Sequence, residues 1–275
     1  MRYRSIGDVE VSAIGLGAMP LSIEGRPDRD RAIATVHAAL DAGVTLIDTA
    51  DSYHWHAGET GHNEVLIAEA LAGYGGDSDA VLVATKGGRG RPGDGSWTVT
   101  GTPAHLKNAC EGSLKRLGVD AIGLYQLHKP DENVPWAESV GAIKELADEG
   151  KIRLAGVSNV SSAQLLEARE ILGEKLVSVQ NEHSPAHLAH EPELALCTEL
   201  GLAYLPWGPL RGIGGEFLAV AEEHGVSPQR VCLAWLLAKS PSLIAIPGST
   251  RPATIRDSVA AADLVLTAEE LARLP

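Results

Sequence analysis

Four side chains, each at the end of a predicted β-strand, have the types needed to move a proton: Asp48, Tyr53, Lys86 and His128. They stand in the segments LIDTADSY, VLVATKGG and LYQLHKPD. A phenol has a pKa of about 10 in water, but a nearby ammonium stabilises its phenolate form, and a carboxylate can hold that ammonium in place. An imidazole beside them can hydrogen-bond a bound carbonyl. Together the four residues predict protonation of a carbonyl oxygen, and they lack a source of electrons.

The chain that positions these residues alternates short apolar segments with amphipathic ones. Strands are predicted to end near Gly17, Asp48, Thr85, Leu127, Val157, Gln180, Leu205 and Ile246. Apolar residues recur every three to four positions, as in helices, over 30–43, 63–73, 103–118, 135–150, 161–173, 190–201, 227–240 and 251–263. Residues 3–12 alternate around a Gly-Asp turn and predict a β-hairpin.

About eight strands and eight helices over 275 residues favour an α/β fold, the (β/α)8 TIM barrel, with the N-terminal hairpin closing its bottom. Enzymes built on this barrel carry their active sites at the C-terminal ends of the strands, where the four residues lie. A doubly wound open sheet is the competing arrangement. No linker or low-complexity tract divides the chain, so residues 1–275 are expected to form a single domain.

Composition excludes several classes of function. The net charge of −13 argues against a nucleic-acid-binding surface, because neutralising phosphates requires clustered Lys and Arg. Cys110, Cys197 and Cys232 are widely separated and fit a reducing compartment better than a disulfide framework. The N-terminus lacks the apolar core of a signal peptide, and no run approaches ~20 apolar residues. We expect a cytoplasmic protein that binds neither nucleic acid nor membrane.

Two short motifs have competing interpretations. Residues 88–93 match the GxGxxG fingerprint, but they continue as a Gly- and Pro-rich loop where the fingerprint needs a helix, which favours an active-site loop. His54 and His56 form an HxH pair of the kind used by metal-dependent hydrolases on this barrel, and His183 could add a ligand. The last strand ends LIAIPGST, without a carboxylate, so no metal is expected. The hydrolase is kept as an alternative function.

Taken in order, the segments IDTADSY, GHNE, ATKGG, LYQLHKPD, GVSN, VQNEHS and IPGST resemble the aldo-keto reductase superfamily nearly from end to end. The likeness is to bacterial-type members with a short C-terminal tail, and VQNEHSPAHL with IPGST resembles the pyridoxal reductase branch. The resemblance implies a βα-barrel that binds a nicotinamide cofactor without a Rossmann domain. NAD(P)H would then be the missing electron source for reducing an aldehyde or ketone to the alcohol.

The resemblance also implies a role for each of the four residues. Tyr53 would be the general acid in reduction and the general base in oxidation. Lys86 would lower the pKa of Tyr53, and Asp48 would pair with Lys86. His128 would orient the carbonyl. Because some relatives serve as subunits attached to ion channels, a non-catalytic nicotinamide-sensing subunit is a second alternative.

A cofactor site follows from the same resemblance. Ser158, Asn159 and Gln180 match positions that bond the nicotinamide carboxamide, and Trp207 falls where the family usually stacks a Tyr or Phe on the nicotinamide ring. The other expected cofactor residues are Gly17, Ala18, Met19, Asp48, Pro209, Leu210, Gly212, Gly248, Ser249, Thr250, Arg251, Thr254, Asp257 and Ser258. Many relatives have Lys at Gly248 and Arg at Thr254. Arg251 and Arg256 are the nearby cations that remain, so NADP(H) is expected in preference to NAD(H).

The expected substrate is a small-molecule carbonyl compound in an aromatic, uncharged mouth. The residues expected to frame that mouth are Met19, Tyr53, His54, Trp55, Gly88, His128 and Trp207. Steroid-type relatives have a longer C-terminal loop than a chain ending at Pro275, which argues for an open pocket and against a steroid specialist. The resemblance favours a monomer.

Overall fold

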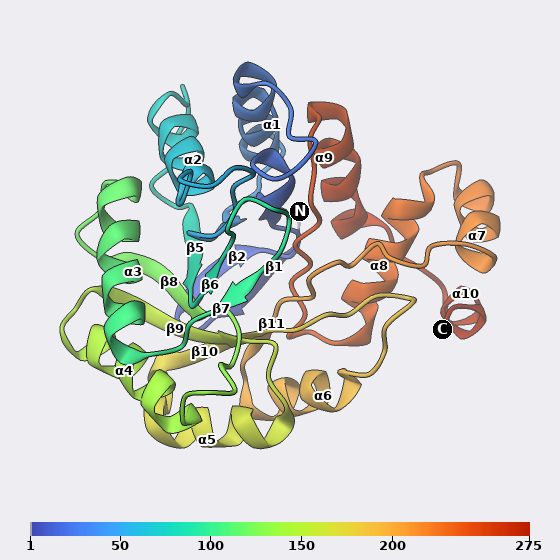
Figure 1. Cartoon of the computed structure of the whole chain (residues 1–275). Helices are drawn as coiled ribbons and strands as arrows, with labels where there is room; N and C mark the ends of the chain where they lie inside the picture. Colours follow the sequence, from blue (N-terminus) through green and yellow to red (C-terminus); the bar gives the residue numbers. More distant parts are fainter. Residues whose placement is uncertain (1) are drawn as a thin grey trace.

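Seven parallel strands form the centre of the protein in a computed structural model that describes residues 2–275. Their order is β3 (Leu16–Gly17), β4 (Leu46–Asp48), β5 (Leu82–Gly87), β8 (Ile122–Leu127), β9 (Ile152–Ser158), β10 (Leu176–Gln180) and β11 (Ala203–Tyr204). The strands follow one another in sequence order, as in a βα-barrel, and helices surround them (Figure 1). The predicted fold class is therefore confirmed.

Residues 243–248 take the place of the eighth strand of the barrel, although they form isolated β-bridges and no regular strand. Leu243 bridges Tyr204 on one edge of the sheet, and Ala245 bridges Ile14 on the other, both in parallel. At the second edge the chains approach closely: a Cβ on Gly17 would lie 2.6 Å from the carbonyl oxygen of Ile246. Glycine is therefore required where the ring closes.

The helices lie outside the strands. They are α1 (Arg29–Asp41), α2 (His62–Ala72), α3 (Pro103–Leu117), α4 (Trp136–Asp148), α5 (Ser162–Leu172), α6 (Glu191–Leu200), α7 (Glu216–His224), α8 (Pro228–Lys239), α9 (Pro252–Val259) and α10 (Ala268–Arg273). The eight helical patterns in the sequence all correspond to helices, whereas α7 and α10 were not predicted. Side-chain caps fix several starts; Asp28, for example, accepts a hydrogen bond from the Arg31 amide and begins α1.

The predicted hairpin is present as β1 (Tyr3–Ile6) and β2 (Val9–Ser12), paired antiparallel. Its Ile6 and Val11 are fully buried and belong to the cluster that fills the barrel interior, together with Leu46, Leu82, Ala84, Leu124, Leu154, Val177, Ala203, Leu205, Ile244 and Ile246. The hairpin therefore closes one end of the barrel, and the site must lie at the other end.

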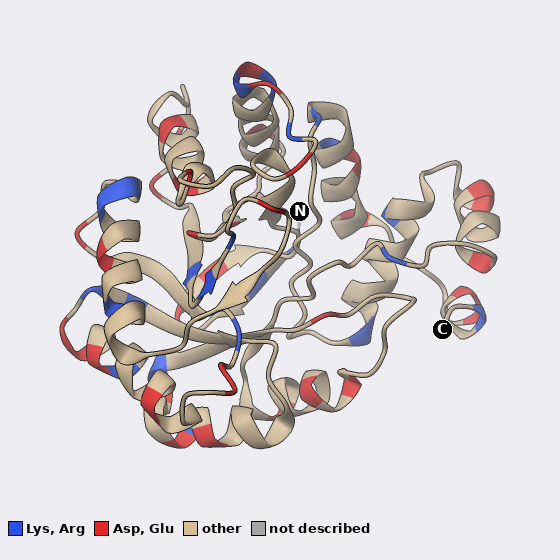
Figure 2. Ribbon diagram, in the orientation of Figure 1, with Lys and Arg blue, Asp and Glu red and all other residues tan. Residues whose placement is uncertain are grey.

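Charged residues lie mainly on the outer helices, with acidic residues prominent on α5, α6 and α7 (Figure 2). Cys110, Cys197 and Cys232 are buried free thiols. Within residues 2–275, no helix is both long and apolar enough to cross a membrane.

Candidate active site

Three of the four residues selected from the sequence extend the inward-facing rows of neighbouring strands, and the fourth, Tyr53, lies in the loop after β4. Side chains of a strand alternate between its faces, so every second residue points into the barrel. In β4 the buried Leu46 is followed two residues later by Asp48, and in β5 Ala84 is followed by Lys86. Beyond β8, His128 continues the row that begins with Leu124. The apolar layers of the barrel thus give way to polar ones at its open end.

Lys86 is the centre of this polar layer. Its side chain is fully buried, and its ammonium donates to Asp48 Oδ2 at 2.7 Å, to the Thr49 carbonyl at 2.9 Å and to the Tyr53 hydroxyl at 3.0 Å. All three ammonium hydrogens are therefore used. The structure brings Asp48, Lys86 and Tyr53 together in the order expected from the sequence.

The electrostatics of the pair differ from the expectation in one respect. Burial raises the pKa of the Tyr53 phenol, and this outweighs the opposite effect of the Lys86 ammonium. Burial also acts to lower the pKa of Lys86, but Asp48 and Tyr53 together outweigh it, and that pKa is raised. Lys86 thus acts on the pKa of Tyr53 in the expected direction, but the net shift is upward. The phenol is protonated and the ammonium charged near neutral pH.

His128 faces Tyr53 edge to face, with ring centroids 5.7 Å apart. Burial, with Lys86 and Arg89 adding to it, holds the pKa of His128 well below its ordinary value, so the ring is neutral near pH 7. Its Nδ1 lies 3.4 Å from the Ser52 hydroxyl. If that hydroxyl donates to Nδ1, the proton of the ring is on Nε2, where it can be donated to a ligand.

A second set of hydrogen bonds connects the strand ends around the site. Gln180 donates to Asp48 Oδ1 at 2.8 Å. Asn159, which has a left-handed backbone conformation with φ of 60°, donates to the His128 carbonyl and accepts from the Trp207 indole at 3.1 Å. Asn is among the few residues that adopt this conformation readily. Gln180 therefore orients the Asp48 carboxylate, and Asn159 orients the Trp207 ring.

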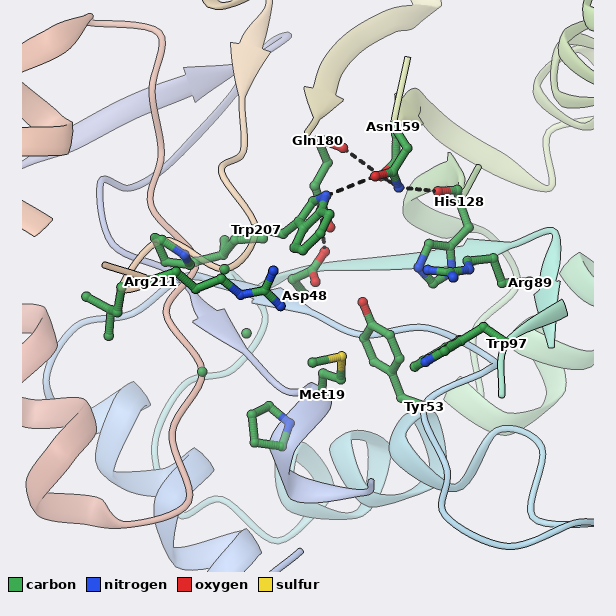
Figure 3. Close-up of a pocket in the computed structure, with 18 residues that line it drawn as sticks. Met19, Asp48, Tyr53, Arg89, Trp97, His128, Asn159, Gln180, Trp207 and Arg211 are labelled. Carbon is green, nitrogen blue, oxygen red and sulfur yellow. Dashed lines mark hydrogen bonds between the residues drawn. The ribbon is translucent and has the colours of Figure 1, made fainter. Parts of the chain in front are cut away.

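A cavity of about 550 Å³ opens above these residues, and Figure 3 shows the side chains around it. Its wall includes many of the residues selected from the sequence: Gly17, Met19, Asp48, Tyr53, His128, Ser158, Asn159, Gln180, Trp207, Pro209, Leu210 and Gly248. The other selected residues lie outside this wall: Ala18, His54, Trp55, Lys86, Gly88, Gly212, Ser249, Thr250, Arg251, Thr254, Asp257 and Ser258.

Several of the outlying residues have other partners. The Asp257 carboxylate accepts from Arg230 at 3.1 Å and from Ser227, which ties α9 to the start of α8. His54 is buried, and its Nδ1 lies 2.9 Å from the His56 carbonyl within the same loop. Among residues 2–275 no three His, Cys, Asp or Glu side chains come together as a possible metal site, so the HxH pair gains no third ligand.

Sequence reasoning missed Arg89, Trp97 and Arg211, which also line the cavity, along with Pro20, Gly208 and Ile246. Arg89 and Trp97 lie on or beside a small antiparallel ribbon, β6 (Arg89–Gly90) and β7 (Thr98–Val99). The expectation of an active-site loop there is consistent with this placement. The expectation of an uncharged mouth is wrong, because the Arg89 guanidinium reaches the wall.

Comparison with known proteins agrees with this geometry. The family model described as "Aldo/keto reductase family" matches residues 13–215 and 213–275. A pyridoxine 4-dehydrogenase of Escherichia coli is 36% identical over 285 aligned positions, covering 98% of this chain and 96% of the relative.

Two solved structures also resemble the whole chain. An aldo/keto reductase from Klebsiella pneumoniae in complex with NADP and acetate has a TM-score of 0.82 and 27% identity, covering 98% of this chain and 93% of the other. A glycerol dehydrogenase from Gluconobacter oxydans has a TM-score of 0.83 and 29% identity, covering 98% and 92%. The chain belongs to the aldo/keto reductase family of NAD(P)H-dependent oxidoreductases.

Proposed function

We propose that this protein reduces a small aldehyde or ketone to the alcohol with NADPH, and that Tyr53 supplies the proton. The observation that carries the proposal is the buried chain Asp48–Lys86–Tyr53, whose phenol reaches the wall of a cavity beside His128. A protonated phenol at that place can donate to a carbonyl oxygen, and this is a proton transfer that a general acid must make.

Each residue has a distinct part in this proposal. As Tyr53 gives up its proton, negative charge develops on its oxygen 3.0 Å from the Lys86 ammonium, which stabilises it. Asp48 holds the ammonium in place at 2.7 Å. A neutral His128 donates from Nε2 and orients the carbonyl oxygen toward the phenol. The bound nicotinamide would supply the hydride to the carbonyl carbon.

The residues of the cavity suit a nicotinamide ring. Trp207 lines the cavity with its ring held by Asn159 and by the Arg211 guanidinium, 5.1 Å from the ring centroid. A fixed indole face offers a stacking surface. Gln180 uses its amide N–H on Asp48, which leaves its carbonyl oxygen able to accept from a carboxamide.

We further propose NADPH as the preferred cofactor, which the neighbour solved with NADP supports. Arg251 is exposed and precedes the first residue of α9, and Arg256 lies on the same helix. Among residues 2–275 neither side chain has a carboxylate partner within ion-pair distance. The guanidinium of Arg251 at the helix start, where backbone N–H groups also point outward, fits a phosphate group, and Arg256 adds a second positive charge in the last turn of the same short helix.

For the substrate we propose an aromatic or heteroaromatic aldehyde in an open pocket. The similarity to a pyridoxine 4-dehydrogenase makes pyridoxal, the aldehyde that such an oxidation yields, the first compound to assay. We also propose that the protein acts as a monomer, as the family resemblance of its sequence favours.

The deciding experiment is Tyr53→Phe, followed as NADPH consumption with pyridoxal and with substituted benzaldehydes. We expect a loss of at least ~10²-fold in kcat, the usual contribution of a general acid, with NADPH binding retained. Tyr204→Phe is a matched control, because it removes another buried hydroxyl, one that has no partner within residues 2–275 and lies off the cavity wall.

The same assay separates the alternatives. Tyr53→Phe turning over at the wild-type rate would refute the role given to Tyr53. Tight NADPH binding with negligible turnover of any carbonyl would favour the sensing subunit. Zinc bound in the purified protein, with a hydrolytic activity that chelators abolish and no NADPH consumption, would favour the metal-dependent hydrolase.

A further inference from the structure

The Arg89 guanidinium has no anionic partner although it reaches the wall of the cavity. Among residues 2–275 its side chain makes no hydrogen bond and no ion pair, and its Nε is buried without any acceptor. Arg89 is half-buried, a desolvated charge without a partner is costly, and a guanidinium is well suited to bind a carboxylate or a phosphate. The unused donors of Arg89 therefore need a function.

Two other arginines at or near the cavity do have anionic partners. Arg91 donates to Glu24 and to the His54 carbonyl, and Arg211 donates to Glu182. The one carboxylate in the described cavity wall, that of Asp48, is already bonded by Lys86 and Gln180. The cavity therefore carries one positive charge in excess, at Arg89.

Trp97 holds this guanidinium in position. Its ring lies 4.6 Å from Arg89 and 4.5 Å from Arg91, measured from the ring centroid to the guanidinium carbon. The same ring meets Tyr53 and His128 edge-on, with centroids 6.5 Å away in each case. An arginine stacked on an aromatic face keeps the edge of its guanidinium free for a planar or tetrahedral oxyanion.

Arg89 is close enough to the reacting groups to belong to the substrate site. Figure 3 shows it beside His128 and on the same side of the cavity as Tyr53 and Trp97, opposite Arg211. Its charge helps to lower the pKa of His128 and opposes the rise in the pKa of Tyr53. A small molecule whose carbonyl lies at Tyr53 and His128 can therefore reach Arg89 with a second group.

We propose that Arg89 binds an anionic oxygen group of the substrate, so that the preferred substrate is an aldehyde or ketone carrying a carboxylate or a phosphate. This inference rests on the proposed carbonyl reduction and narrows its substrate class. It also replaces the uncharged mouth expected from the sequence with one that carries a positive charge at Arg89. Trp97 acts here as a positioning residue for Arg89.

Three aldehydes test the proposal with NADPH: 4-carboxybenzaldehyde, 4-formylphenyl phosphate and the uncharged methyl 4-formylbenzoate. We expect wild-type kcat/KM for one or both anions to exceed that for the ester by at least about tenfold, since charged hydrogen bonds contribute about that much or more. Arg89→Met should reduce this anion-to-ester ratio about 10- to 100-fold, and Arg89→Lys should reduce it less. The anionic aldehyde with the higher kcat/KM shows whether Arg89 prefers a carboxylate or a phosphate.

Arg153→Met is the matched control, because Arg153 is exposed near the start of β9, away from the cavity, and its loss removes the same charge. It should leave the ratio unchanged. An unchanged ratio in Arg89→Met, or an equal loss with all three aldehydes, would overturn the proposal. Preference of the wild type for the ester would overturn it as well.

A binding measurement separates failure of this inference from failure of the proposed reaction. We expect Trp emission to be quenched by two alcohols that lack the aldehyde, 4-(hydroxymethyl)benzoate and 4-(hydroxymethyl)phenyl phosphate. Arg89→Met should bind them at least about tenfold more weakly than the wild type does. A wild type that binds these anions but reduces no aldehyde would contradict the reductase and keep the anion site. A wild type that reduces the ester but binds neither anion would contradict only the anion site.

Discussion

The buried pair of Lys86 and Asp48 allows one perturbation to be worked out in detail. Lys86→Met removes the ammonium and leaves the Asp48 carboxylate, whose side chain is only 5% exposed, without its ionic partner. Gln180 at 2.8 Å is then its main remaining donor. Removing one member of a buried ion pair costs about 3–5 kcal/mol, because the other charge remains desolvated. The melting temperature should fall by about 6–20 °C.

The double variant Asp48→Asn/Lys86→Met should be more stable than Lys86→Met alone. The neutral amide can still accept from Gln180, and no uncompensated charge remains buried. We expect the second substitution to restore about 1–3 kcal/mol, within the usual range of coupling between contacting residues. Carbonyl reduction should stay at least ~10²-fold below wild type in both variants, because neither has an ammonium beside Tyr53. The double variant would thus regain stability without regaining activity.

Thermal unfolding followed by circular dichroism measures the first effect, and NADPH consumption measures the second. Lys144→Met is the control: it breaks an exposed pair with Asp148 and should cost less than about 1 kcal/mol. The reasoning fails if Lys86→Met melts within a degree or so of the control, or if the double variant is no more stable than the single one. Either result would mean that Asp48 does not carry a buried charge.

Two further predictions concern stability and cofactor choice. Burial raises the pKa of Asp51 from 3.8 to about 8, so the folded state holds a proton that the unfolded state releases, and this carboxyl should destabilise the fold progressively as pH rises from about 4 to about 8. Asp51→Asn should flatten that decline in melting temperature, and an unchanged slope would contradict the assignment. Arg251→Ala should weaken NADPH binding about tenfold and leave NADH binding unchanged; equal effects on both, in a titration of Trp emission, would remove Arg251 from the phosphate site.

The fold and the centre of the site could be read from the sequence because both depend on strand ends. The segments ending at Asp48, Lys86 and His128 are apolar, short and regularly spaced, and parallel strands place their C-terminal ends at one face. The eighth strand was predicted to end near Ile246, but that segment forms only isolated β-bridges. Short amphipathic helices such as α7 and α10 lack a pattern long enough to separate them from loops.

What the sequence could not supply was burial and loop geometry. The net direction of the Tyr53 pKa depends on how completely the phenol is enclosed, which no local pattern records. The Gly- and Pro-rich segment around Arg89 has no periodicity, and its two-residue strands form through contacts made in three dimensions. Arg89 and Trp97 therefore entered the site only with the structure.

The closure of the ring at residues 243–248 has a consequence for folding. Most strand ladders of the barrel join consecutive strands, whereas the bridge between Ile14 and Ala245 joins nearly opposite ends of the chain. Contacts between residues so far apart in the sequence have the largest cost in loop-closure entropy, so the contact between residues 14–17 and 243–248 should form last. Gly17 and Gly248 form another β-bridge where the barrel closes, and both line the cavity. The last contacts to form would thus complete the cavity, and a ligand bound there would stabilise the closed barrel.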